Sequence, residues 1–282
     1  MAKSLQHRIN AGRVAVTNQV DFFHRQFGQV PSEWKEDDTR VTFADFAISE
    51  RIFAELRQAF PGDAYCSEES NPADEAVSLR SGYGWILDPI DGTNNYALGM
   101  TSCAISLALL KNGVPVYGFI YDMSRRVLIQ GGPGLGLLDG THKASVKTEP
   151  LERQSIIGLH FPMNAAHYRA LEQPLGIYRV RCLGSGALVA AYAAIGKLDG
   201  AIDFKVKVWD IAAAYALVLA GGGEFHFLDA PLFPIETFHP RLPPTPYVAG
   251  SSHFCKAALD WMGKPANPIP LATNGANEPT NE

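Results

Sequence analysis

An apolar strand closes on two carboxylates in the stretch Trp85-Ile86-Leu87-Asp88-Pro89-Ile90-Asp91-Gly92-Thr93. Pro89 fixes one backbone angle and lacks a donor, and Gly92 permits a tight path, so the acidic, carbonyl and hydroxyl oxygens can converge. Such oxygens are the ligands that Mg²⁺, Mn²⁺ and Ca²⁺ take, and no neighbouring Cys or His favours zinc. The stretch therefore predicts a metal site at a strand end. The alternative is an ordinary Asp-Pro turn in which Asp88 caps a helix.

Two further segments place acids in a comparable setting. Residues 64–70 predict a short strand that ends in the pair Glu68-Glu69, and residues 207–213 open an apolar helix with Asp210 near its start. Taken singly, a pair of glutamates is more often a solvated surface, and an aspartate at a helix start is more often a cap. The occurrence of all three segments in one chain favours a shared site.

In this order and spacing the segments resemble the inositol monophosphatase family of metal-dependent, lithium-sensitive phosphatases. The family signatures are a Glu-Glu pair, Asp-Pro-Ile-Asp-Gly-Thr, and Trp-Asp followed by small residues, and the resemblance spans about residues 5–260. It implies two or three Mg²⁺ ions, with Mn²⁺ as a substitute and Ca²⁺ and Li⁺ as inhibitors. The metal ligands that it implies are Glu68, Asp88, the Ile90 carbonyl, Asp91 and Asp210.

The resemblance also implies roles in catalysis. Thr93 and Glu68 would orient the attacking water, and Asp45 would receive the proton that Thr93 passes on. From the residues alone, Asp45 is instead interpreted as an acid in the first turn of a helix. Lys35 resembles a family lysine near the phosphate, but its spacing favours a solvated side chain.

Substrate contacts are implied mainly for the second half of the chain, where backbone groups at a helix start near Ser185 suit a polar ligand. Asp203 is shorter than the Glu that inositol phosphatases commonly carry, and a turn residue at a strand end is its alternative interpretation. The full set of implied contacts is Asp91, Gly92, Thr93, Gly184, Ser185, Gly186, Asp203 and Asp210.

We therefore expect a magnesium-dependent phosphomonoesterase that hydrolyses a small polyol or sugar phosphate with metal-activated water, inositol monophosphate being the first candidate. Phosphatases of fructose 1,6-bisphosphate, histidinol phosphate and 3'-phosphoadenosine 5'-phosphate share the metal core and stay open as alternatives. A regulatory or binding protein that retains the fold is the alternative of another class. Clustered carboxylates argue against it, because they repel one another without a metal.

Composition and charge indicate which classes of protein the chain does not fit. The chain has 282 residues, of which 46% are hydrophobic, and a formal net charge of -5, so it suits a large core and offers no general attraction to nucleic acid or anionic membrane. We expect no membrane span, no secretory leader, a cytoplasmic location and the homodimer usual in the family. The cysteines lack metal or redox spacing, so reduced, buried thiols are expected at Cys66, Cys103, Cys182 and Cys255.

Periodicity divides the chain into two halves and a tail. Residues 1–150 predict an α+β half that carries metal-binding motifs, with apolar helical stripes over 5–27 and 46–60, an antiparallel meander over 103–130, and a glycine-rich hairpin at 131–136. Residues 151–263 predict an α/β half that carries the Trp-Asp motif and selects the substrate, with one helix expected near residues 164–172. Residues 264–282 predict a disordered tail. The resemblance implies that the whole is an α+β protein, the layered αβαβα sandwich of the sugar phosphatases.

Overall fold

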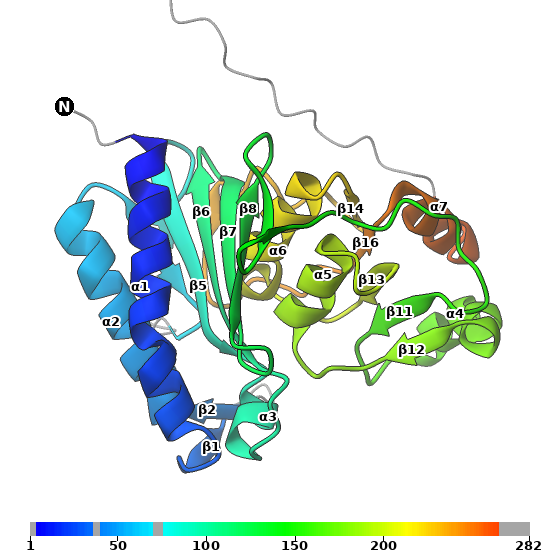
Figure 1. The fold of residues 1–282 in the computed structure, drawn as a ribbon, viewed down its shortest axis with the longest axis horizontal. Helices are drawn as coiled ribbons and strands as arrows, with labels where there is room; N and C mark the ends of the chain where they lie inside the picture. The colour runs from blue at the N-terminus through cyan, green and yellow to red at the C-terminus, as the bar shows by residue number, and fades with distance from the viewer. Residues whose placement is uncertain (1–3, 36–39, 70–75, 265–282) are drawn as a thin grey trace, which may run out of the picture.

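The computed structural model describes residues 4–35, 40–69 and 76–264. Within these ranges the elements stack as helices, sheet, helices, sheet and helices (Figure 1). The α+β layered sandwich expected from the sequence is therefore confirmed. None of the described helices is both long and apolar enough to cross a membrane.

The first layer is a pair of amphipathic helices, α1 (Leu5–Gln26) and α2 (Phe43–Ala59). Their buried faces follow the predicted stripes, with Val16 and Phe23 two turns apart on α1. These faces pack on strands of the larger sheet and bury the cluster that fills the first interlayer space. A short antiparallel pair, β1 (Ser32–Trp34) and β2 (Arg40–Thr42), leads from α1 into α2.

The larger sheet has the strand order β10-β9-β8-β7-β6-β5-β3, and all its pairs are antiparallel except β3 with β5. The predicted meander is present, and the turn at Asn112-Gly113 has positive φ at both residues, as a type I' hairpin turn requires. The predicted glycine-rich hairpin joins β8 to β9. The strands are β3 (Ala64–Ser67), β5 (Tyr83–Asp91), β6 (Ala104–Lys111), β7 (Val114–Asp122), β8 (Val127–Gly132), β9 (Gly136–Asp139) and β10 (His142–Lys143).

The middle layer consists of α5 (Gly186–Ala194) and α6 (Val208–Ala220), which lie between the two sheets. Both helices are rich in alanine and buried on nearly every side, so the sheets can approach closely. A side chain at Gly118 of β7 would meet the backbone of α6, which explains the glycine there. The core around α6 contains residues from both predicted halves, 1–150 and 151–263. The division of the chain into these two halves therefore stays a proposal.

The second sheet has the order β12-β11-β13-β16-β14, with β11 parallel to both of its neighbours. Its strands are β11 (Ile156–Leu159), β12 (Arg179–Arg181), β13 (Gly200–Asp203), β14 (Glu224–Phe227) and β16 (Tyr247–Gly250), and α4 (Ala165–Ile177) and α7 (Ser252–Trp261) form the outer layer. The short elements are α3 (Thr93–Ala97) and the pair β4 (Val77–Ser78) with β15 (Thr237–Phe238).

Three sequence predictions need comment. Helix α4 runs five residues past the predicted end at 172 and continues through Pro174, whose missing N–H removes one backbone donor without ending the helix. The prediction that every thiol is buried is wrong for Cys182, which follows the edge strand β12 and is exposed. The tail predicted for 264–282 lies outside the described residues except at Lys264, whose ammonium donates to the Leu228 carbonyl.

Candidate metal-dependent active site

The loop at the end of β5 turns two acids toward one place. The pairing of β5 with β6 shifts register between Asp88 and Asp91, where Pro89 offers no donor and the Ile90 N–H donates to Asp88 Oδ1 at 3.0 Å. Gly92 follows with a φ of +83°, and a Cβ there would lie 2.9 Å from the backbone oxygen of residue 102. Glycine is therefore required at this turn.

Buried aspartates from β5 and α6 meet at this point. Carboxylate oxygens of Asp88, Asp91 and Asp210 lie within 4.8 Å of one another. Asp210 belongs to the first turn of α6, where its Oδ2 accepts from the Lys207 N–H at 2.7 Å. Burial raises the pKa of Asp91 to about 6. Burial and the charges of neighbouring acids, including Glu68, raise the pKa of Asp88 and Asp210 well above the usual value.

The donor set of this cluster fits a hard divalent cation. Glu68 directly follows β3, and its N–H donates to the Leu87 oxygen at 3.1 Å, so it joins the edge at which β5 ends. The Ile90 carbonyl accepts from Thr93 Oγ1 at 2.9 Å and keeps a second lone pair. All of these ligand candidates are oxygens, which Mg²⁺ and Ca²⁺ prefer, and their negative charges repel one another until a cation binds.

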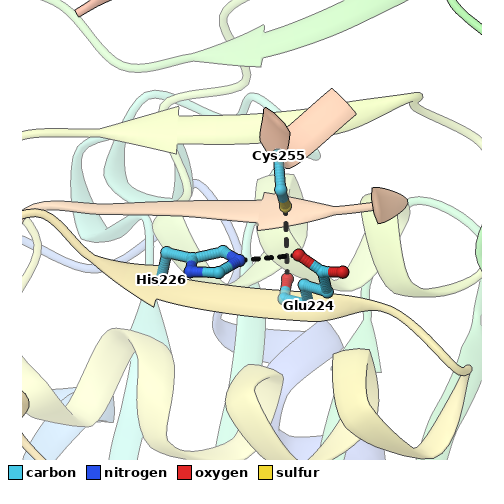
Figure 2. A group of neighbouring side chains, drawn as sticks. All are labelled: Glu224, His226 and Cys255. Atoms are coloured by element: carbon cyan, nitrogen blue, oxygen red, sulfur yellow. Dashed lines mark hydrogen bonds and ion pairs between the residues drawn. The ribbon is translucent and has the colours of Figure 1, made fainter. Parts of the chain in front are cut away.

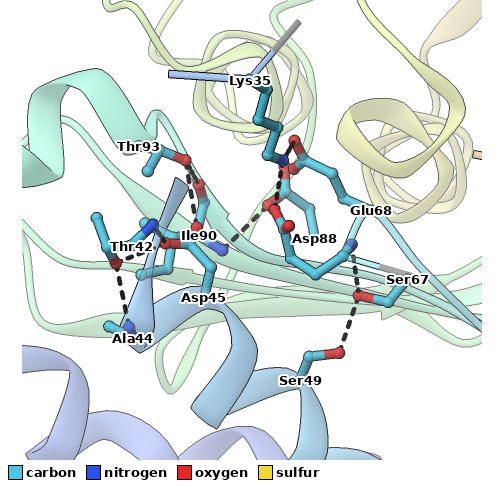
Figure 3. Close-up of polar contacts among 11 residues, drawn as sticks. Lys35, Thr42, Ala44, Asp45, Ser49, Ser67, Glu68, Asp88, Ile90 and Thr93 are labelled. Carbon is cyan, nitrogen blue, oxygen red and sulfur yellow. Dashed lines mark hydrogen bonds and ion pairs between the residues drawn. The ribbon is translucent and has the colours of Figure 1, made fainter. Parts of the chain in front are cut away.

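Lys35 points into the acidic cluster and is not the solvated lysine that its spacing suggested (Figure 3). Its Nζ lies 2.9 Å from Glu68 Oε1 and 2.6 Å from Glu69 Oε1. Burial alone would lower the pKa of Lys35, but the charges of the two glutamates outweigh burial and raise it. The lysine therefore holds the Glu68 carboxylate in place beside β5.

Asp45 is both a helix-capping acid and a neighbour of Thr93 (Figure 3). Its Oδ2 accepts from the Thr42 N–H at 2.7 Å and from the Thr42 hydroxyl at 2.6 Å, while Thr93 Oγ1 lies 3.3 Å from Oδ1. Burial raises the pKa of Asp45 to about 7 against the effect of the Thr42 hydrogen bonds. Asp45 is thus the first-turn helix acid that the residues predict and also contacts Thr93, as the resemblance implies.

The start of α5 binds Asp91. The N–H groups of Gly186 and Ala187 donate to the Asp91 carboxylate at 3.1 and 2.9 Å, and the Ser185 hydroxyl also donates to it. Ser185 is 1% exposed, so the donors expected to meet a substrate are engaged inside the protein. The positive end of the helix therefore supports the charged form of Asp91.

Asp203 and His160 form a pair that the sequence analysis missed. His160 follows β11, Asp203 ends β13, and the parallel register places the two residues side by side. The Nδ1 of His160 lies 3.0 Å from Asp203 Oδ2, and the Lys205 N–H donates to Oδ1 at 2.8 Å. The hydrogen bond that His160 donates to Asp203 raises the pKa of His160 although burial opposes it. Asp203 is therefore a turn residue through Oδ1, which accepts from the Lys205 N–H. Its Oδ2 binds the His160 imidazole.

The acidic cluster and His160 line one cavity of about 720 Å³. Asp203 itself lies behind His160 and is fully buried. The predicted site residues that line the cavity are Glu68, Asp88, Ile90, Asp91, Gly92, Thr93, Gly184, Gly186 and Asp210, and the cavity is also lined by Arg40, His160, Lys205 and Lys207.

Together, the layered sandwich and a cavity floored by oxygen ligands define a class of protein, the metal-dependent phosphatases with an α+β sandwich fold. The sequence model of the inositol monophosphatase family matches residues 5–259. The chain belongs to this family and is a phosphatase that hydrolyses phosphomonoesters.

Relatives with several functional names share this sequence. An inositol-1-monophosphatase of Mesorhizobium japonicum is 32% identical over 73% of this chain and 79% of that protein. A fructose-1,6-bisphosphatase/inositol-1-monophosphatase of Aquifex aeolicus is 26% identical over 81% and 89%. The Nus factor SuhB of Pasteurella multocida is 30% identical over 67% and 72%.

Solved structures agree in fold. The extragenic suppressor protein suhB from Bartonella henselae has a TM-score of 0.80 at 24% identity and covers 92% of this chain and 99% of its own. An IMPase/NADP phosphatase complexed with NADP and Ca²⁺ has a TM-score of 0.78 at 22% identity, with 98% of each chain covered.

Adding Mg²⁺ to chelator-treated protein is expected to raise its thermal stability, and more so at about pH 8 than at about pH 5. The carboxyl groups with raised pKa hold more protons in the folded metal-free protein than in the unfolded chain, so metal-free stability falls as pH rises from the usual Asp value through about 6 to 7. At 100 times its Kd, an ion would contribute about 2.7 kcal/mol. Thermal unfolding at both pH values tests this, and equal gains would contradict a carboxylate site.

Proposed function

We propose that this phosphatase requires Mg²⁺ and hydrolyses a small polyol or sugar phosphate, with inositol monophosphate as the first candidate. The single observation that carries the proposal is the convergence of Asp88, Asp91 and Asp210 beside Glu68 on the floor of one cavity. A phosphate ester would be repelled by this floor unless cations lay between the two.

Glu68, Asp88, the Ile90 carbonyl, Asp91 and Asp210 would hold two or three ions. When bound, Mg²⁺ would supply Lewis-acid chemistry, polarising the phosphate and lowering the pKa of water. The protein fixes its ligands beforehand: Lys35 holds Glu68, the start of α5 holds Asp91, and the start of α6 holds Asp210. Ser185 and the backbone of Gly186 are therefore assigned to the positioning of Asp91.

Thr93 and Asp45 would manage the proton of the attacking water. The Thr93 hydroxyl can accept a hydrogen bond from water on its lone pair while its own proton points to Asp45 or to the Ile90 carbonyl. Glu68 would orient the same water. Because Asp45 is held by Thr42 through two hydrogen bonds, its free oxygen stays directed at Thr93.

A substrate panel tests the proposal. Phosphate release would be measured from inositol 1-phosphate, fructose 1,6-bisphosphate, histidinol phosphate and 3'-phosphoadenosine 5'-phosphate, with Mg²⁺ and with EDTA, and with Li⁺ as an inhibitor. We expect one preferred substrate whose turnover is lost in EDTA and returns with Mg²⁺. Turnover that persists in EDTA would overturn the metal mechanism.

A substrate with a second anionic group is the alternative that the cavity wall favours. His160, Lys205 and Arg40 line the cavity, and Asp203 accepts from Nδ1 of His160, which favours the imidazolium with its other nitrogen as a donor. A sugar bisphosphate would meet these cations with its distal phosphate. The bifunctional name of the Aquifex aeolicus relative supports this candidate.

If the second anion binds here, His160→Ala should raise KM for fructose 1,6-bisphosphate about tenfold, since a hydrogen bond to a charged group is worth about 1.5–3 kcal/mol. KM for inositol 1-phosphate should change by less than about twofold. His142→Ala, an exposed histidine on β10, is the matched control. A parallel loss on both substrates would instead indicate a general role for His160 in shaping the site.

A regulatory role with the fold retained is the alternative of another class, supported by the relatives named Nus factor SuhB. Absence of turnover on the whole panel, with Mg²⁺ bound, would favour it. The homodimer and the cytoplasmic location stay predictions. Light scattering of the purified protein tests the first of these.

A further inference from the structure

A polar triplet lies between β14 and α7, on elements distinct from those of the acidic cavity. Glu224 and His226 alternate along β14 and therefore share one face of this edge strand. Helix α7 covers that face and brings Cys255 over the pair. Figure 1 shows α7 at the opposite end of the molecule from α1 and α2.

The imidazole of this triplet is poorly satisfied for a buried group. His226 is 4% exposed, its Nε2 lies 2.7 Å from Glu224 Oε2, and its Nδ1 has no hydrogen-bond partner among the described residues. Cys255 is fully buried, and its thiol donates to the Glu224 backbone oxygen at 3.6 Å, its one hydrogen-bond partner in the part of the chain that the structure describes. Burying these polar groups in the apolar layer under α7 costs free energy that an apolar triplet would avoid.

The three side chains converge on one point (Figure 2). One ligand atom from each lies within 4.8 Å of the others. Tetrahedral zinc, with bonds of about 2.0–2.3 Å, needs ligand atoms about 3.5 Å apart, so small side-chain rotations suffice. Glu224 is half-buried and can rotate toward solvent, which leaves an entry path.

A nucleophilic cysteine is the competing interpretation of the triplet, and the geometry opposes it. In a Cys-His-acid nucleophile the thiol and the acid bind opposite nitrogens of the imidazole. Here Glu224 binds Nε2, and the Cys255 thiol points to the backbone of Glu224. A fully buried sulfur also gives a substrate no access.

We propose that Glu224, His226 and Cys255 form a zinc site that joins β14 to α7. One thiolate, one imidazole and one carboxylate are a donor set that Zn²⁺ accepts and that Mg²⁺ does not prefer. On binding, the thiol releases its proton to solvent, and the two anionic ligands balance the charge of the ion. The three protein ligands leave the fourth tetrahedral position to a water molecule, and the bound ion would tie the last helix to an edge strand.

Cobalt substitution of the full chain tests the site. Chelator-treated protein would be saturated with Mg²⁺, to fill the oxygen ligands, and titrated with Co²⁺. We expect a thiolate-to-cobalt absorption band that saturates at one equivalent and disappears when Zn²⁺ is added. Cys255→Ser should lose the band and keep phosphatase activity. Cys103→Ser, a buried thiol near the acidic cavity, is the matched control and should retain the band.

X-ray absorption of the wild-type zinc protein requires no variant and guards against misfolding of Cys255→Ser. One sulfur at about 2.3 Å, with nitrogen and oxygen neighbours at about 2.0–2.2 Å, is expected. Zinc should also raise the thermal midpoint of the wild type more than that of His226→Gln. A wild-type protein with no cobalt-thiolate band, or a band that survives Cys255→Ser, would overturn the site without affecting the phosphatase proposal.

Discussion

Replacing Asp88 by Asn is expected to lower kcat/KM by at least about a thousandfold, equivalent to about 4 kcal/mol of transition-state stabilisation. The reason is the loss of one of the charges that would hold the Mg²⁺ ions. The metal-free variant should be at least as stable as the wild type, because the neutral amide removes repulsion inside a fully buried cluster and its carbonyl can still accept from the Ile90 N–H. Steady-state kinetics and thermal unfolding in EDTA measure the two effects.

Lost activity together with retained metal-free stability distinguishes an acid that binds metal from an acid that only supports the fold. Asp21→Asn, an exposed aspartate on α1, is the matched control and should change neither quantity. Asp91→Asn is a weaker test than Asp88→Asn, because Asp91 accepts from Ser185, Gly186 and Ala187, and an amide would direct an N–H group at these donors. Activity near the wild-type level in Asp88→Asn would rule out the proposed metal ligation.

The second large effect is expected from Thr93→Val, which should lower kcat by about a hundredfold or more with little change in KM. Valine keeps the shape of the side chain but cannot accept from water or donate toward Asp45. The Ile90 carbonyl would lose its hydrogen bond from Thr93 while keeping its position in the bulge. Substrate affinity should therefore survive while proton handling fails.

Thr93→Ser is the matched control, because it restores the hydroxyl without the methyl group. We expect it to recover most of kcat. Single-turnover kinetics in saturating Mg²⁺ would show whether the chemical step is the one that slows. Normal single-turnover rates in Thr93→Val would show that a group other than Thr93 handles the proton of the attacking water.

The helices and strands that carry the site could be predicted because their signals are local. The apolar stripe of α1 and the turn at Asn112-Gly113 follow from side-chain period and from positive φ, and neither needs a distant partner. The end of α4 was harder to place, because proline usually ends or kinks a helix, whereas α4 continues through Pro174 to Ile177.

Partners of the site residues were harder to predict than the residues themselves. Lys35 reads as solvated until β1 and β3 place it against Glu68. His160 carries no motif, and only the parallel pairing of β11 with β13 puts it beside Asp203. Knowledge that these two strands are neighbours would have revealed the pair.

The sequence by itself determined that acids and a carbonyl converge at the end of β5, because Pro89 and Gly92 restrict the backbone between Asp88 and Thr93 within a few bonds. Only the tertiary structure decided what each acid binds. The donors at the start of α5 point to Asp91, which is 95 residues away from Gly186 in the chain. Backbone restrictions act between neighbouring residues, whereas burial and hydrogen-bond partners depend on which distant elements pack together, and that packing is a property of the whole core.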